Sequence, residues 1–266
     1  VGSWIDHARN RLLSKGTTIS YKGSYTSANS LTEWGISARY RGFETKINEW
    51  VRVDSAGFTL GTLPEQLTLT SFEHNEDFFS SIGAESYINN ATGFTFAERN
   101  WDINTGLRIS YDTYNRQVLF SPRASIKVYI SPDFSAHIAV GAYHQPPGGR
   151  ELMRHIGGIE YPLKAQRSYH LTTGTSLSFF SGERPFRFTA EIYAKKMDQL
   201  IPYKVDNVRV QYSGVNSAHG YATGIDFKIN GEFVKDAESW ASLSFMRTRE
   251  DIKGDSYVNA DSLLIY

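Results

Sequence analysis

The sequence predicts an all-β chain: an antiparallel transmembrane β-barrel segment of about eleven or twelve long strands, an incomplete barrel. Three observations carry this prediction. Apolar and polar residues alternate with period two through most of the chain, and helical periodicity is nearly absent. The alternating runs are about ten residues long, which is the length that a tilted strand needs to cross a bilayer. Short and long connections alternate between the runs, as they do in outer-membrane barrels.

The clearest alternation lies in residues 186–195. Phenylalanine, alanine and isoleucine occupy one face of this segment, and arginine, threonine, glutamate, tyrosine and lysine occupy the other. Residues 220–230 and 169–179 divide in the same way. In a membrane barrel the apolar face meets lipid and the polar face lines a hydrated lumen. Such a lumen implies a barrel of about sixteen or more strands, because smaller barrels are filled by their own side chains.

The second half of the chain shows the most regular order of strands. We expect strands at residues 125–130, 135–143, 169–180, 186–195, 221–230 and 240–249. Short turns at 131–133, 181–185 and 235–238 alternate with long segments at 144–168 and 196–219. A soluble sandwich gives no reason for this alternation, since both ends of its sheets face the same solvent.

The first half is less regular. We expect strands at residues 18–25, 34–41, 46–53, 79–88 and 106–111, with a long segment at 54–77. Aromatic residues near strand ends are expected to form girdles at the two membrane interfaces, where an amphipathic ring is favoured, although ordinary half-buried strand aromatics are the alternative. These aromatics are Trp34, Trp50, Trp101, Tyr143, Tyr169, Tyr193, Tyr221 and Trp240.

Composition excludes several classes of function. The 28 basic and 28 acidic side chains balance, which argues against nucleic-acid binding. The chain has no cysteine, so disulfides, thiolate catalysis and cysteine-based metal sites are excluded. None of the seven histidines forms a zinc-binding pair, and no nucleophile elbow or phosphate loop is present. We therefore expect neither an enzyme, nor a cofactor, nor a metal site.

Short motifs follow one another in a distinctive order. Residues 104–111 hold a Gly-Leu-Arg strand, residues 119–125 hold a Ser-Pro-Arg sequence, and residues 142–147 end in Gln-Pro-Pro. This ordered set resembles the barrel of TonB-dependent outer-membrane receptors. Residues 47–57, 220–233 and 239–246 are similar to the form that this family takes in the Bacteroidota.

The resemblance implies an active-transport receptor of the bacterial cell outer membrane. Such a receptor binds a scarce nutrient at its extracellular loops and passes it through a plugged barrel, energised by TonB. Residues 1–266 would then be a single partial barrel domain, an internal or C-terminal piece without the plug. The implied partners are outer-membrane lipid, the plug domain and remaining strands, the TonB complex through the missing N-terminal part, and a surface lipoprotein.

Candidate binding residues lie in one long loop and on one strand face. Loops on rigid scaffolds often carry binding residues, and a solvated charge cluster is the alternative. The loop candidates are His144, Gln145, Arg150, Glu151, Arg154 and His155. The expected lumen-facing residues are Arg187, Glu191, Asp226 and Lys228, which we expect to pair with one another or with the plug, or to contact a passing solute.

Two other functions stay open. A barrel hydrolase would need carboxylate–His or Ser–His groups converging at one rim, and a soluble secreted β-rich binding or adhesion module would bury its apolar faces in a closed core. Siderophore, cobalamin, glycan and peptide all remain possible nutrients, because the outer loops and the plug together decide specificity in such receptors.

Overall fold

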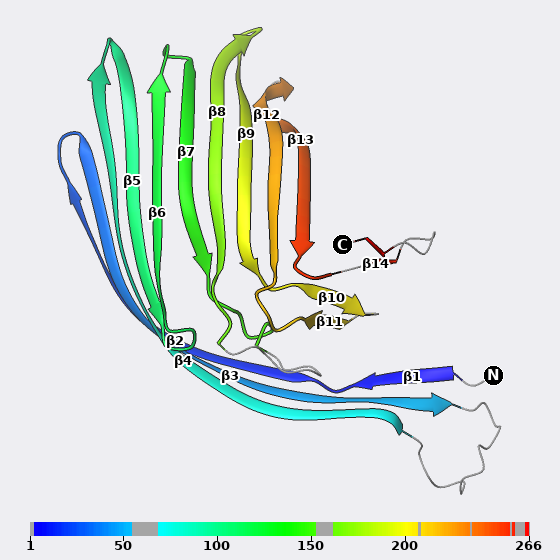
Figure 1. Ribbon diagram of the computed structural model, residues 1–266. Helices are drawn as coiled ribbons and strands as arrows, with labels where there is room; N and C mark the ends of the chain where they lie inside the picture. The colour runs from blue at the N-terminus through cyan, green and yellow to red at the C-terminus, as the bar shows by residue number, and fades with distance from the viewer. Residues whose placement is uncertain are drawn as a thin grey trace, which may run out of the picture.

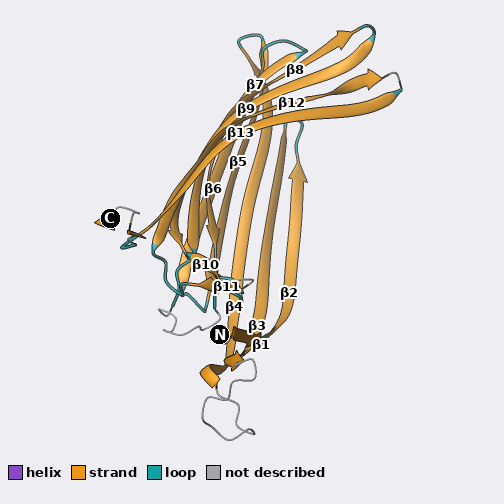
Figure 2. Cartoon of the chain, turned by 90° about the vertical axis from the view of Figure 1, so that its right-hand side faces the viewer, coloured by secondary structure: helices purple, strands orange, loops and turns teal. Residues whose placement is uncertain are grey.

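The structure, a computed structural model, describes residues 3–54, 69–152, 162–206, 209–234, 236–255, 257–258 and 264–265. Strands dominate these residues, and Figure 2 shows only strands and loops. None of the described segments is a helix that could cross a membrane. The strands are β1 (Ser3–Ala8), β2 (Arg11–Thr26), β3 (Ser30–Asp54), β4 (Leu69–Phe96), β5 (Arg99–Asp112), β6 (Gln117–Tyr129), β7 (Phe134–Gln145), β8 (Gln166–Ser181), β9 (Arg184–Leu200), β10 (Tyr203–Asp206), β11 (Arg209–Tyr212), β12 (Ala218–Val234), β13 (Ala237–Ile252), β14 (Tyr257–Val258) and β15 (Leu264–Ile265).

Within the described ranges, eleven strands form one antiparallel sheet. Strands β3 to β9 pair in chain order, β12 and β13 continue the sheet, and β1 and β2 pair with successive parts of β3. The sheet curves without closing on itself (Figure 1). This architecture confirms the prediction of an incomplete antiparallel barrel.

The connections differ between the two ends of the sheet. Tight turns such as Ala97–Glu98 and Gly182–Glu183, whose four residues have φ between 50° and 65°, lie at the upper end in Figure 1. The other end, which we call the mouth, carries the connections at 146–165 and 201–217. The second of these contains the β10–β11 hairpin. The alternation therefore extends to the first half, although the mouth connection at 113–116 is short.

Strand β3 corrects the expected pattern, because residues 34–41 and 46–53 belong to one strand of 25 residues. The intervening residues 42–45 pair without a break with residues 77–80 of β4, so the glycine at 42 does not mark a turn. The expected long segment at 54–77 is also partly strand, since β4 begins at Leu69. Residues 55–68 of that segment lie outside the described residues.

The two longest strands leave the sheet at the mouth. Pairing between β4 and β5 ends at Gly83 and Asp112, whereas β3 and β4 stay paired out to Arg52 and Leu69. Residues 43–54 and 69–82, together with β1, therefore form a projecting ribbon, here called the mouth ribbon. It bends away from the upright strands and runs below the β10–β11 hairpin (Figure 1).

Register separates an apolar face from a polar face along the sheet. On β9, Ile192 lies opposite Thr173 of β8 and Ile225 of β12, and Ile225 lies opposite Phe245 of β13. Ile192 is 56% exposed, as expected for a side chain that meets lipid. The apolar faces of the sheet are thus turned outward, away from any packed core.

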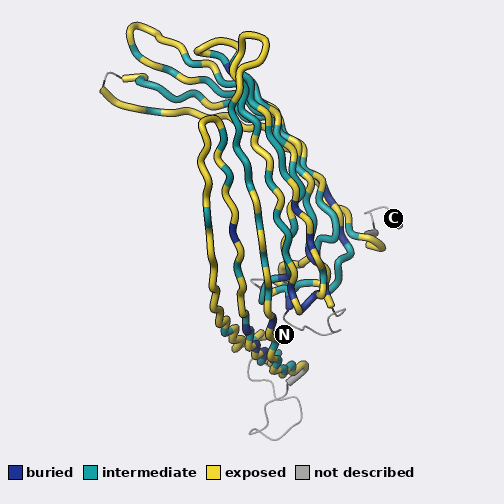
Figure 3. The backbone as a smooth tube through the Cα atoms, turned by 90° about the vertical axis from the view of Figure 1, so that its left-hand side faces the viewer, coloured by how far each residue is buried: buried dark blue, intermediate teal, exposed yellow. Residues whose placement is uncertain are grey.

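The packed part of the molecule lies at the mouth, on the polar side of the sheet. Tyr114, Leu152, Leu163 and Ile201 are buried together against Phe43 and Phe79, which share a strand face with Arg39 and Arg41. Figure 3 shows the buried positions gathered toward this end. The mouth connections therefore fold over the polar face, which makes it the lumen side.

Three of the expected girdle aromatics lie on the lumen side, so that part of the girdle prediction was wrong. Tyr143 contacts His170 at 4.5 Å between ring centroids. The ammonium groups of Lys195 and Lys228 lie 5.6 Å and 5.7 Å from the rings of Tyr193 and Trp240. Strand register, rather than position near a strand end, decides which face an aromatic side chain occupies.

Candidate functional site

The first loop candidates stand at the mouth end of β7. His144 Nδ1 lies 3.0 Å from Ser121 Oγ of β6, and Gln145 pairs with Gln166 of β8 in register. In the described part of the chain, no carboxylate forms an ion pair with His144. A Ser–His pair without a third orienting group lacks the arrangement that activates a serine nucleophile.

Of the next loop candidates, Glu151 supports the local structure of the loop and Arg150 is exposed. Glu151 accepts hydrogen bonds from the backbone N–H of Gly148 at 2.7 Å and from Gln166 Nε2 at 2.8 Å. These bonds use both carboxylate oxygens, so Glu151 holds the turn that places Leu152 in the buried cluster. Arg150 is exposed at the mouth. Arg154 and His155 lie outside the described residues.

The four expected lumen residues share the polar face of β9 and β12. Glu191 and Asp226 lie directly opposite each other, which places like charges side by side. Glu191 instead approaches His137, with 3.4 Å between Oε2 and Nε2. No ion pair joins any two of Arg187, Glu191, Asp226 and Lys228 among the described residues. These four side chains therefore do not form ion pairs with one another in the structure.

Over the described ranges, no group of three or more histidine or acidic side chains is placed to hold a metal ion. The lumen side instead offers hydrogen-bonding and ionic groups that are spread over many strands.

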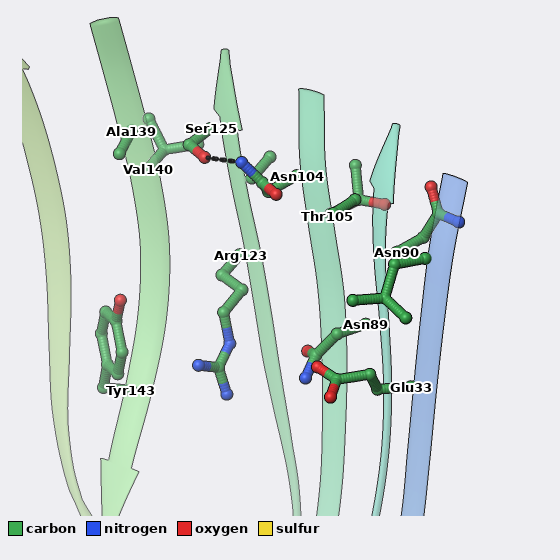
Figure 4. A pocket seen from close by; sticks show the side chains of 13 residues that line it. Glu33, Asn89, Asn90, Asn104, Thr105, Arg123, Ser125, Ala139, Val140 and Tyr143 are labelled. Atoms are coloured by element: carbon green, nitrogen blue, oxygen red, sulfur yellow. Dashed lines mark hydrogen bonds between the residues drawn. The ribbon is translucent and has the colours of Figure 1, made fainter. Parts of the chain in front are cut away.

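A lumen cavity of about 320 Å³ lies against strands β3 to β7 (Figure 4). Its wall includes Glu33, Asn89, Arg123 and Tyr143, which come from four different strands. Arg123 extends over Gly106 of β5, where an added Cβ would lie 3.1 Å from Arg123 Cγ. No hydrogen bond or ion pair to Arg123 is present among the described residues, so its guanidinium is available to a ligand or a partner.

An adjoining cavity of about 410 Å³ continues this wall toward the edge of the sheet. Its charged side chains form a group that we call the basic lane: Lys22, Arg39, Arg108 and Arg123, with Glu33 and Glu85. Within the lane, Arg108 Nε lies 3.7 Å from Glu85 Oε1. Nearby, Arg41 forms an ion pair with the buried Asp112. Four cations against two anions give the lane a positive balance.

The basic lane was missed in the sequence, where Arg108 and Arg123 served only as motif residues. The alternation of polar and apolar residues in 33–41 and 119–125 places Arg39 and Arg123 on polar faces. It could have indicated that these two side chains face the lumen. Only the pairing order of β2 to β6 brings them together.

Comparison with known proteins identifies the class to which this barrel segment belongs. A family model described as TonB dependent receptor-like, beta-barrel, matches residues 3–263. The chain belongs to this family, and it is a β-barrel segment of the bacterial outer membrane. None of the curated proteins compared with the chain matches it.

Solved structures with the same fold include three outer-membrane transporters or receptors. The outer membrane transporter YddB from Escherichia coli has a TM-score of 0.57 at 12% identity and covers 90% of this chain and 34% of its own. The RagAB peptide transporter has a TM-score of 0.57 at 14% identity, with 96% and 32% covered. The pyoverdine receptor FpvA from Pseudomonas aeruginosa has a TM-score of 0.54 at 11% identity, with 92% and 37% covered. The chain thus spans about a third of the length of these proteins, and the likeness shows a shared fold.

Proposed function

We propose that the protein containing this chain binds a scarce nutrient outside the cell and passes it through a plugged barrel, energised by TonB. One observation supports this most directly: a membrane-facing apolar surface encloses a polar lumen wall whose arginine side chain at 123 has no protein partner in the described structure. A wall of this kind suits hydrated transport or plug contact better than a closed core.

The proposal includes the arrangement of the whole receptor. Residues 1–266 form one part of a single barrel domain, and a plug domain and further strands complete it. The plug contacts the lumen side, the TonB complex acts through the plug segment, and a surface lipoprotein meets the mouth. The positive basic lane supports plug contact, because its exposed and half-buried cations would attract anionic or polar groups of a plug.

The proposed ligand contacts are polar groups at the mouth, where Gln145 and Arg150 are exposed and His144 is half-buried. His144, Gln145 and Arg150 stand there in the structure, and Arg154 and His155 belong to the same connection. Arg187, Glu191, Asp226 and Lys228 are proposed to contact the plug or a passing solute from the opposite part of the wall. Glu151 contributes by holding the turn.

A growth experiment tests the transport function. A deletion strain is supplied, one source at a time, with defined siderophore-bound iron, cobalamin, glycan and peptide. We expect a growth defect on one source only, restored by the full-length gene. An Arg123→Gln receptor should restore it less well, whereas Lys127→Gln serves as the matched control on the same strand, because the Lys127 ammonium already lies 4.4 Å from the centroid of the Tyr129 ring.

Two results would contradict the proposal. One is unimpaired growth of the deletion strain on every source. The other is hydrolysis of peptide or lipid by the purified full-length protein, which would favour a barrel hydrolase instead.

A further inference from the structure

The outer face of the mouth ribbon carries a row of rings. In register, Trp50 of β3 lies directly between His7 of β1 and Phe72 of β4. His74 follows Phe72 on the same face, because side chains two positions apart in a strand point to the same side. We call these four residues the ring row.

The rings of this row are stacked rather than scattered. His7 and Trp50 have centroids 5.2 Å apart and planes inclined by 13°, and Phe72 and His74 have centroids 6.3 Å apart and planes inclined by 7°. The guanidinium carbon of Arg9 lies 5.6 Å from the centroid of the Trp50 ring. Asn10 fixes the backbone beside Arg9, since its Oδ1 accepts a hydrogen bond from the N–H of Asn48 at 3.1 Å.

Packing within the protein does not explain the ring row. The opposite face of the ribbon is the buried one: Ile47 is 1% exposed, Thr45 is 2% exposed and Glu49 is 8% exposed. Phe72 on the outer face is 62% exposed. Trp50 and His7 beside it are half-buried, so the row forms one contiguous, partly exposed patch, which indicates an interaction surface.

Lipid contact does not explain the row either. About ten residues of tilted strand suffice to cross a bilayer. His74 precedes the tight turn at Ala97 by 23 positions, so it stands well beyond the membrane at the mouth end. The ring row therefore lies outside the membrane at the end with the long connections, which is the extracellular end in outer-membrane barrels.

The charge around the row is positive. Arg9 and Arg52 are exposed, and Arg52 shares the face of Trp50 because it lies two positions further along β3. One carboxylate on this face, Glu76, hydrogen-bonds to Lys46 and lies 3.7 Å from His74 Nε2. The hydrogen bond and charge of Lys46 hold the pKa of Glu76 below its usual range. That pair is neutral as a whole, which leaves the charges of Arg9 and Arg52 without a described acidic partner.

We propose that the ring row with Arg9 and Arg52 is a surface site for an anionic saccharide. The exposed ring of Phe72, with the half-buried ring of Trp50 beside it, offers an apolar surface to the C–H faces of sugar rings. The two guanidinium groups can take carboxylate or sulfate groups in bidentate hydrogen bonds. The site lies outside the lumen and does not depend on the transport function.

Binding to the purified full-length receptor in detergent tests this site. The probes are polygalacturonate and heparin as anionic saccharides, dextran as a neutral one and oligothymidylate as a nucleic acid. We expect saturable binding of at least one anionic saccharide and weak binding of dextran. The double variant Trp50→Ala/Phe72→Ala should lose affinity by about tenfold, and Arg9→Gln/Arg52→Gln by a similar factor.

Trp101→Ala is the matched control, because Trp101 lies near the tight-turn end, where its Nε1 donates to the carbonyl of Phe96 at 3.2 Å. It should keep the affinity of the unsubstituted receptor. Resistance to unfolding in a heated gel shift confirms that each variant is folded. Equal binding of dextran and polygalacturonate, tighter binding of oligothymidylate, or unchanged affinity in the double variants would overturn the assignment.

Discussion

Glycine at certain positions of this sheet makes room for a ring on the neighbouring strand. Gly224 lies directly opposite Tyr193, and an added Cβ would lie 2.5 Å from the Tyr193 hydroxyl oxygen and 2.7 Å from the backbone oxygen of Phe245. A side chain can move, but a backbone oxygen in a paired strand moves only with its strand. The residue type at 224 is therefore set by close packing between strands.

Gly224→Ala should lower the free energy of unfolding by about 1–3 kcal/mol because the added methyl group overpacks the sheet. Gly16→Ala is the control, since its nearest new contact would be an ordinary 3.6 Å to the backbone oxygen of Tyr40. Urea unfolding of the full-length receptor, followed by tryptophan fluorescence, measures both. Equal destabilisation by the two substitutions would argue against the packing explanation.

The ion pair between Arg41 and Asp112 allows a second residue-scale prediction. Asp112 is buried and also accepts a hydrogen bond from the backbone N–H of Tyr114 at 2.9 Å. Arg41→Gln should destabilise the receptor by about 3 kcal/mol, because it leaves a buried carboxylate without its cation. Adding Asp112→Asn should recover much of this loss. Additive effects of the two substitutions in urea unfolding would contradict the coupling.

At the scale of one element, β9 presents two faces to two environments. Ile192 faces lipid, whereas Thr189 lies opposite Lys228 on the lumen side. Ile192→Arg should cost about 2–4 kcal/mol if the site lies near the bilayer midplane, and Thr189→Arg should cost little. The measurement is the folded fraction of receptor in outer-membrane preparations, read from the heated gel shift. A folded fraction that falls equally for both would show that the faces are not distinguished by lipid.

The β4–β5 turn offers a gain in stability. Ala97 and Glu98 have φ of 50° and 60°, a left-handed backbone that costs ordinary residues about 1 kcal/mol each. Replacing them by Asn-Gly, the pair that this type of turn favours, should raise the unfolding midpoint in urea. Changing Ser131 and Pro132 to Asn-Gly is the control, since neither has positive φ. A lower midpoint for the 97–98 variant would contradict the turn assignment.

Sequence patterns were informative for elements and less so for sites. Strands such as β8 and β9 were predictable because each alternates on its own, without reference to distant segments. The continuity of β3 was not, because a glycine in a strand resembles a break until the partner strand is known. The polar position of Arg123 could be predicted from its own strand. Its neighbours Glu33 and Asn89 could not, because they come from other strands that only the order of the sheet brings beside it. The sequence also did not show that Glu151 of the candidate ligand loop uses both carboxylate oxygens in hydrogen bonds to Gly148 and Gln166.

At the scale of the whole molecule, the sheet has two open edges within the described residues. β2 is paired only with β3, and β13 is paired only with β12. Backbone groups at such edges are costly in lipid, where water cannot satisfy them. We therefore expect both edges to pair with further strands in the full-length receptor.

Hydrogen exchange tests this continuation. In the chain of residues 1–266 alone in detergent, outward-facing amides of β13 should exchange more than about tenfold faster than in the full-length receptor. Amides of the central strand β8 serve as the control and should differ little in the folded fraction. Equally fast exchange of β13 in both proteins would show that no strand joins this edge.

The pairing of rings with glycines also bears on how the strands find their register during assembly. Apolar–polar alternation disfavours a register slip of one residue, because every side chain would move to the other face of the sheet. A slip of two residues keeps every side chain on its own face, so alternation does not disfavour it. Trp34 lies opposite Gly23, Tyr87 opposite Gly35, and Phe186 opposite Gly231. A two-residue slip would set these rings against positions that carry a side chain, so each pair rejects a misalignment that preserves both faces. The glycines thus favour the native register over a slip that the alternation alone would allow.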